Sequence, residues 1–164
     1  MGSTDGKKIK GRKRHIFVDT QGNILNVCVL PANIADSEGA YDLLDVIHQR
    51  YPTITMMWAD GAYVSNVDTF SDIYTITVAI TKKPEHTTGF VVIPRRWVVE
   101  RTFAWLGRYR ILGKEYTHRA EYSETAIYMA SIHRILNKLH PNPDKIQPYR
   151  SKLRSENILH TVIT

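Results

Sequence analysis

Residues 94–108 carry a single carboxylate, Glu100, among arginines and aromatic side chains. Helical spacing places Arg96 and Glu100 on one stripe of a predicted helix, next to an apolar stripe that contains Trp97 and Trp105. A carboxylate at the border of a basic face can bind a metal ion beside a polyanion. The same spacing also permits an ordinary ion pair between Arg96 and Glu100, and the helix alone does not decide between the two interpretations.

A second carboxylate, Asp60, closes a predicted strand in the sequence WADGAY, residues 58–63. Ligands of open α/β sheets collect at the carboxyl ends of strands, and Gly61 frees the backbone to turn away there. An ordinary Asp-Gly turn or a helix cap is the alternative interpretation. A helix and a strand separate Asp60 from Glu100, which allows the two carboxylates to meet across the end of a sheet.

Hydrophobic periodicity predicts the elements that must position these acids. The β-rich runs 15–20 and 24–30 are joined by Gln21, Gly22 and Asn23, which predicts a hairpin. There follow a helix from Asp36 or Ser37 to Pro52, a strand over 53–60, a short helix from Ser65, a strand over 75–81, a polar loop over 82–93, the Glu100 helix, and a last helix from Ser123 to Pro141. The predicted class is therefore α/β.

Composition limits the kind of protein and its partners. The 164 residues are 43% hydrophobic, which is typical of one globular domain, and the net charge of +6 favours an anionic partner such as nucleic acid. No apolar run of about 18 residues and no signal-peptide pattern is present. The single Cys28 fits a reducing compartment, so we expect a cytoplasmic protein without a membrane partner.

Basic residues form three separate clusters, which match a phosphate track better than a single patch does. We predict a flexible basic arm over 1–14, a domain over 15–140 and a C-terminal tail over 141–164 that carries the third cluster. Solubilising surface is the alternative interpretation of each cluster. The predicted DNA-binding residues are Lys7, Lys8, Lys10, Arg12, Lys13 and Arg14 in the arm, and Arg95, Arg96, Arg101 and Arg108 around the Glu100 helix.

Four blocks in fixed order carry a family resemblance over about Lys7 to Leu139: KKIKGRKRH (7–15), PANIAD (31–36), WADGAY (58–63) and RRWVVERTFAWL (95–106). In these blocks the chain resembles the bacterial insertion-sequence transposases that have a DDE catalytic domain with a ribonuclease H-like fold. Two positions depart from the family pattern. Ile93 stands where a tyrosine is expected, and Gly107, beside Arg108, stands where a basic residue is expected.

The resemblance implies a ribonuclease H-like mixed sheet flanked by helices, with Asp60 and Glu100 as the second and third acids of a catalytic, metal-binding triad. It implies Mg²⁺ (or Mn²⁺) as the cofactor, because two such ions promote in-line displacement at phosphorus. The implied partner is double-stranded DNA, at transposon ends and at the target, and the implied reaction is strand cleavage and transfer. A homodimer and association with the nucleoid are compatible with this function.

The first acid of the triad has no counterpart on a predicted strand before the basic block. Only six residues precede Lys7, and the acids nearest to the expected place are Asp5 and Asp19. The resemblance therefore implies a truncated domain that lacks its first, central strand, between the hairpin and the Asp60 strand. Either the hairpin pairs directly with the Asp60 strand, or another chain fills the gap.

Three functions stay open at this point. The first is a DDE transposase domain that cuts DNA with Mg²⁺. The second is a DNA-binding remnant of a transposase without catalysis. The third is a generic basic α/β domain in which Asp60 and Glu100 never meet, and the positions of these two side chains test it directly.

Overall fold

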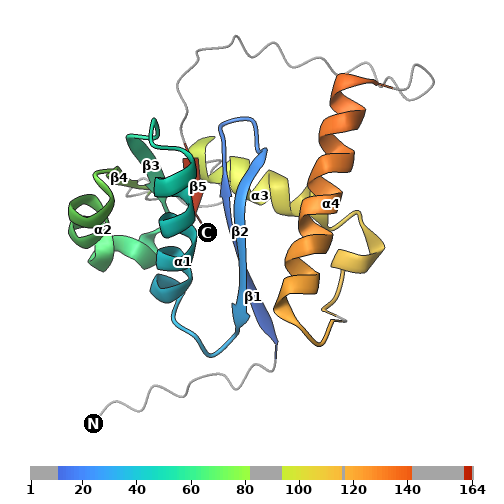
Figure 1. Ribbon diagram of the computed structural model, residues 1–164, viewed down its shortest axis with the longest axis horizontal. Coiled ribbons are helices and arrows are strands. Elements are labelled where there is room, and N and C mark those ends of the chain that lie inside the picture. The colour runs from blue at the N-terminus through green and yellow to red at the C-terminus, as the bar shows by residue number, and fades with distance from the viewer. Residues whose placement is uncertain (1–10, 82–93, 116, 142–160, 164) are drawn as a thin grey trace, which may run out of the picture.

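A computed structural model describes residues 11–81, 94–115, 117–141 and 161–163. The strands are β1 (Arg12–Val18), β2 (Ile24–Pro31), β3 (Met56–Ala59), β4 (Thr77–Ile80) and β5 (Thr161–Ile163). The helices are α1 (Asp36–Arg50), α2 (Val67–Tyr74), α3 (Pro94–Leu106) and α4 (Ala120–Leu139), with 3-10 turns η1 (Gly61–Asn66) and η2 (Arg110–Leu112) (Figure 1). The predicted α/β class and the predicted order of strands and helices up to α4 are confirmed. The predicted loop 82–93 lies outside the described residues.

The hairpin forms as predicted, and its turn is held from two directions. The Asp19 carboxylate accepts hydrogen bonds from the backbone N–H groups of Gln21 and Asn23, both at 2.8 Å. Gly22 has a φ of +80°, and a Cβ on it would lie 2.6 Å from Thr102 Oγ1 on α3. The turn therefore needs glycine both for its conformation and for its close approach to α3. Asp19, one of the two acids nearest to the expected place of the first triad member, therefore holds the hairpin turn together.

A mixed sheet with the strand order β2-β1-β5-β3-β4 forms the centre of the fold. The gap between the hairpin and β3 is filled by β5, which pairs antiparallel with Phe17 and Val18 of β1 and parallel with Met57–Ala59 of β3. Neither direct pairing nor a second chain closes the gap, so both of those expectations are wrong. Residues that we expected in the C-terminal tail supply this strand, and their backbone groups satisfy both neighbours.

Helices cover both faces of the sheet and enclose two cores. Phe17 points to the face covered by α1 and α2, whereas Ile16 and Val18 point to the face covered by α3 and α4, as the alternation of a strand requires. Figure 1 shows α1 and α2 on one side of the hairpin and α4 on the other. The fold is thus a three-layer arrangement in which both layers of helices rest on β1.

Helix α4 lies along β2, the edge strand of the hairpin side. Tyr128 Oη accepts a hydrogen bond from Val27 N at 3.2 Å, and Glu124 Oε1 accepts one from Val29 N at 2.9 Å. These contacts pair backbone groups that an edge strand would otherwise leave open. Ser123, expected as the first residue of this helix, lies inside it, because α4 begins at Ala120.

Two further expectations differ from the structure. The basic arm does not extend to residue 14, because β1 begins at Arg12 and includes Lys13 and Arg14. The short helix expected from Ser65 begins later, because Ser65 belongs to the 3-10 turn η1 and α2 starts at Val67. Among the described helices, none combines the length and the apolar run that a membrane crossing requires.

Candidate functional site

Asp60 lies at the carboxyl end of β3, where the sequence placed it. Its side chain accepts a hydrogen bond from Ala62 N at 2.8 Å and caps η1. The helix-cap interpretation is therefore correct as local geometry. The carboxylate keeps 27% of its surface exposed, and its second oxygen, Oδ2, faces Arg96. Capping and ligand binding are compatible, because a carboxylate offers two oxygens.

Arg96 connects the two acids that the sequence singled out. Its Nε donates to Glu100 Oε1 at 3.0 Å, and its Nη1 forms a longer ion pair with Asp60 Oδ2 at 4.0 Å. The expected i to i+4 ion pair on α3 is thus present. The same guanidinium contacts Asp60 across the end of the sheet, so one arginine lies between the two acids that the third hypothesis keeps apart.

Helix α3 is anchored to the hairpin turn on the side away from Glu100. Thr102 is buried and donates to Gly22 O at 3.3 Å, and Arg101 donates to Gln21 O at 3.2 Å. The Arg101 guanidinium lies between the rings of Trp97 and Trp105, 4.6 and 4.7 Å from their centroids. Burial lowers the pKa of Arg101, and the nearby Arg134 lowers it further. These contacts fix the rotation of α3 and so the direction in which Glu100 points.

A cavity of about 320 Å³ lies beside Asp60. His15, at its wall, is buried, contacts Tyr63 Oη through Nδ1 at 3.4 Å, and has no hydrogen-bond partner at Nε2. Burial lowers the pKa of His15, which favours the neutral ring. The other lining residues are Lys13, Arg14, Asp36, Asp60, Ala62 and Phe103. The cavity therefore has one acid of the candidate site at its edge and two cations in its wall.

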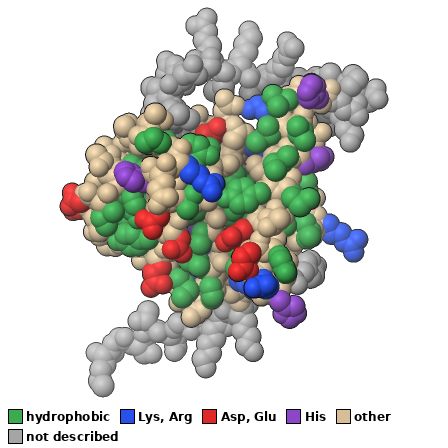
Figure 2. Space-filling view, viewed as in Figure 1, with side chains coloured by type: hydrophobic (Ala, Val, Ile, Leu, Met, Phe, Trp, Pro, Cys, Tyr) green, Lys and Arg blue, Asp and Glu red, His purple; other side chains and the backbone are tan. Residues whose placement is uncertain are grey.

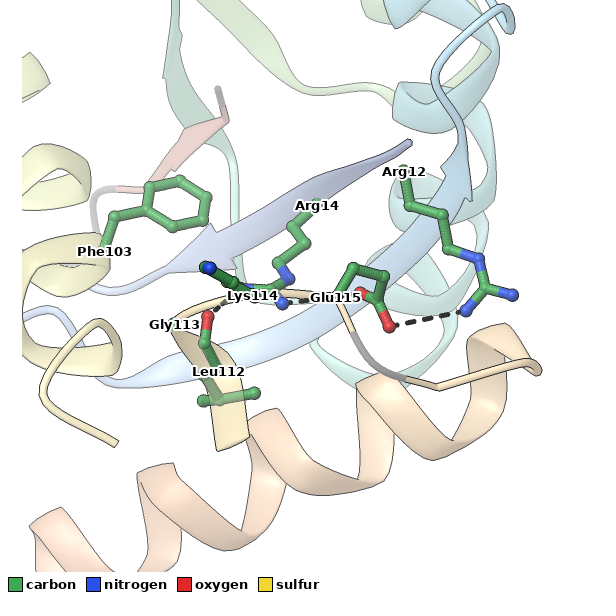
Figure 3. A pocket seen from close by; sticks show the side chains of 7 residues that line it. All are labelled: Arg12, Arg14, Phe103, Leu112, Gly113, Lys114 and Glu115. Atoms are coloured by element: carbon green, nitrogen blue, oxygen red, sulfur yellow. Dashed lines mark hydrogen bonds and ion pairs between the residues drawn. The ribbon is translucent and has the colours of Figure 1, made fainter. Parts of the chain in front are cut away.

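A second cavity, of about 290 Å³, shares Arg14 and Phe103 with the first, and Figure 3 shows its lining side chains. Here Glu115 accepts from Ser123 Oγ at 2.8 Å, from Thr117, and from Arg14 at 3.4 Å, and pairs with Arg12 at 3.6 Å. Burial alone would raise the pKa of Glu115, but the hydrogen bonds from Thr117, Ser123 and Arg14 outweigh it and lower the pKa. Glu115 is thus held as a carboxylate.

The predicted DNA-binding residues occupy different environments. Arg12 and Arg14 bind Glu115 and backbone carbonyls, and Lys13 pairs with Asp36 at 2.9 Å. Arg101 is held between two indole rings, whereas Arg108 is exposed just beyond α3. Lys7, Lys8, Lys10 and the side chain of Arg95 lie outside the described residues. Of the side chains described, Arg96 contacts both acids of the candidate site.

Sequence reasoning missed Glu115, His15 and Tyr63. Glu115 follows η2 in an irregular segment, and its arginine partners lie on β1, far away in the chain. No local spacing signals such a contact. His15 and Tyr63 are 48 residues apart in the chain, so their contact is not visible in local spacing either.

The carboxylates of Asp60 and Glu100 are hard oxygen donors, the kind that Mg²⁺ and Mn²⁺ prefer. In proteins Mg²⁺ is commonly bound by one or two carboxylates, with water and phosphate oxygens completing its shell. The pair fits such an ion on these grounds. Within the described ranges no group of three or more His, Cys, Asp or Glu side chains is placed to hold a metal. A metal at this pair therefore needs phosphate or water as further ligands.

Fold and site together define a class: a mixed α/β domain with one carboxylate at the end of the parallel strand β3, a second on the helix α3, and a guanidinium between them. Residues 2–134 match the family model described as Transposase DDE domain, and the chain belongs to this family. A protein of Burkholderia cepacia, named "Putative transposase for insertion sequence element IS402", is 31% identical over 120 residues. That match covers 68% of this chain and 56% of the relative, so the chain spans about half the length of the curated relative. No solved structure matches.

Proposed function

We propose that this chain is the acid-bearing catalytic part of an insertion-sequence transposase with a ribonuclease H-like sheet, and that it binds double-stranded DNA and promotes Mg²⁺-dependent strand cleavage. Membership of the transposase family supports the class of reaction. The observation that carries the assignment is the position of Arg96, 3.0 Å from Glu100 and 4.0 Å from Asp60. It brings together two acids from separate elements. The hairpin followed by the parallel strands β5, β3 and β4 supports the fold assignment.

In this proposal Asp60 and Glu100 hold the divalent ion. A bound Mg²⁺ would supply activation of the attacking oxygen and stabilisation of the leaving oxygen at phosphorus. Arg96 is the cation nearest to both acids and is well placed to hold a non-bridging phosphate oxygen once the carboxylates turn to the metal. Lys13 and Arg14, in the cavity beside Asp60, border the path along which the flanking phosphates would run.

The experiment is nicking of a supercoiled plasmid with and without Mg²⁺ or Mn²⁺. We expect metal-dependent nicking that falls by at least about 100-fold in Asp60→Asn and in Glu100→Gln, because each substitution removes a metal ligand. Asp72→Asn is the matched control, since Asp72 is an exposed acid on α2. Nicking that survives both site substitutions would contradict the proposal.

A second candidate is a DNA-binding remnant without catalysis. It is favoured by the same guanidinium, because Arg96 already pairs with both carboxylates, and by the lack of a three-acid group among the described residues. This function predicts binding to a short DNA duplex that weakens steeply with salt, with no nicking in either metal. The plasmid assay and a binding titration at two salt concentrations distinguish the two candidates.

A further inference from the structure

Helix α4 carries a second apolar stripe that faces away from the sheet. Its inner face buries Ser123, Ile127, Ala130 and Ser131. On the outer face five large side chains are between 53% and 67% exposed: Tyr122, Met129, Ile132, Leu136 and Leu139. Figure 2 shows hydrophobic side chains along this helix. A helix that is apolar on both sides is usually buried on both sides.

The spacing of the outer stripe indicates which kind of secondary structure can pack against it. Positions 122, 125, 129, 132, 136 and 139 alternate in steps of three and four, which is the a and d pattern of a coiled coil, and Thr125 fills the only polar place. This pattern fits a second helix, whose side chains enter the holes between those of the first. An irregular loop or a flat sheet has no matching period.

We propose that α4 forms a two-stranded, antiparallel coiled-coil contact with α4 of a second copy of this chain. A two-fold axis between Met129 and Ile132 places every a position opposite a d position, with Met129 opposite Ile132 of the second copy and Tyr122 opposite Leu139 of the second copy. The stripe is therefore complementary to itself, as a symmetric dimer requires.

Two further features support this occupant. With about 100 Å² of apolar surface on each of the five side chains, the pair buries about 1,000 Å², which reaches the lower limit of specific interfaces. Glu121 lies in the first turn of α4 and Lys138 in the last. The antiparallel arrangement brings the acidic end of one helix to the basic end of the other and opposes the two helix dipoles.

The dimer is tested by sedimentation of the chain over a concentration series up to about 200 µM, a range suited to a weak interface of this size. We expect a monomer–dimer equilibrium whose dissociation constant rises by at least about 30-fold in Ile132→Lys, because the substitution places a charge in the seam. Ile73→Lys on α2 is the matched control, since Ile73 is 54% and Ile132 is 56% exposed. Both variants keep their monomer fold, which circular dichroism checks.

Direction is tested by disulfide trapping in a Cys28→Ser background. An antiparallel pair joins a Thr125→Cys copy to a Leu136→Cys copy, whereas a parallel pair joins two Thr125→Cys copies. A chain that stays monomeric overturns the proposal and assigns the stripe to a different partner. A dimer that ignores Ile132→Lys, or that yields only Thr125→Cys pairs, overturns it as well. None of these measurements uses DNA or metal, so they stand apart from the proposed catalysis.

Discussion

Two charged clusters in this molecule have opposite compositions. In one, the carboxylate of Glu115 lies between the guanidinium groups of Arg12 and Arg14. In the other, the guanidinium of Arg96 lies between the carboxylates of Asp60 and Glu100. The first cluster has one acid for two cations, and the second has one cation for two acids. Both join segments that are far apart in the chain.

The clusters differ in how completely their groups are satisfied. Glu115 is 22% exposed, accepts hydrogen bonds from Thr117, Ser123 and Arg14, and has a lowered pKa. Glu100 is 49% exposed and accepts one described hydrogen bond, from Arg96. A satisfied, partly buried network stabilises a fold, whereas exposed ion pairs contribute little and leave their groups available to a ligand. The comparison therefore indicates a structural role for Glu115, and the exposure of Glu100 supports the binding role that we propose for it with Asp60.

The largest expected effect is on stability, from Glu115→Gln. The substitution removes the charge that Arg12 and Arg14 face and sets an amide N–H against their donors, so we expect a loss of about 2–3 kcal/mol in the free energy of unfolding. Urea denaturation measures it. Glu100→Gln, the same change in the exposed cluster, should cost less than about 0.5 kcal/mol. Equal losses from the two variants would break the comparison.

The next effect is a pH dependence that belongs to Glu115. Because its folded pKa is lowered from 4.5, its contribution is complete above pH 4.5 and is lost as the pH falls through the lower folded value. The stability gap between the wild type and Glu115→Gln should therefore narrow in acid. Urea denaturation at a series of pH values between about 3 and 7 follows it.

His15 provides an internal control for that measurement. Burial lowers its pKa from 6.5, so its neutral form contributes stability above pH 6.5 that is lost as the pH falls toward the folded value. This loss occurs equally in the wild type and in Glu115→Gln. The two stability curves should run parallel below pH 6.5 and converge only below pH 4.5. Convergence already at pH 6 would assign the pH dependence to another group.

Local pattern predicted the parts of this fold that are built from neighbouring residues. The hairpin was predicted from two β-rich runs around Gly22. The position of Asp60 at the end of a strand was predicted from the alternating residues before it and the glycine after it. The strand β5 could not be predicted this way, because three residues carry no period and their partners lie on β1 and β3, far away in the chain. It also lies beyond the residues 2–134 that match the family model.

In the candidate site, too, contacts between neighbouring residues could be predicted and contacts between distant segments could not. The pair of Arg96 and Glu100 is readable from helical spacing, whereas the contact of Arg96 with Asp60 depends on how α3 rests on the sheet. From its charge alone, the segment 1–14 was predicted to be a single flexible arm. Its last three cations are bound in the strand β1 because Glu115 and Asp36, from later segments, reach them. Charge along the chain does not tell which cations are already paired.

The smallest effect concerns stability at the exposed cluster, where Arg96→Ala should change the free energy of unfolding by less than about 0.5 kcal/mol. In the proposed site Arg96 competes with the metal for both carboxylates, so its removal should strengthen Mn²⁺ binding by about two- to thirtyfold, because two exposed pairs worth about 0.2–1 kcal/mol each sum to about 0.4–2 kcal/mol. Water-proton relaxation in a Mn²⁺ titration measures the affinity, with Arg108→Ala as the control for loss of an exposed arginine. Weaker Mn²⁺ binding in Arg96→Ala would mean that Arg96 holds the two acids in place for the metal, and the exposed cluster would then be as structural as that of Glu115.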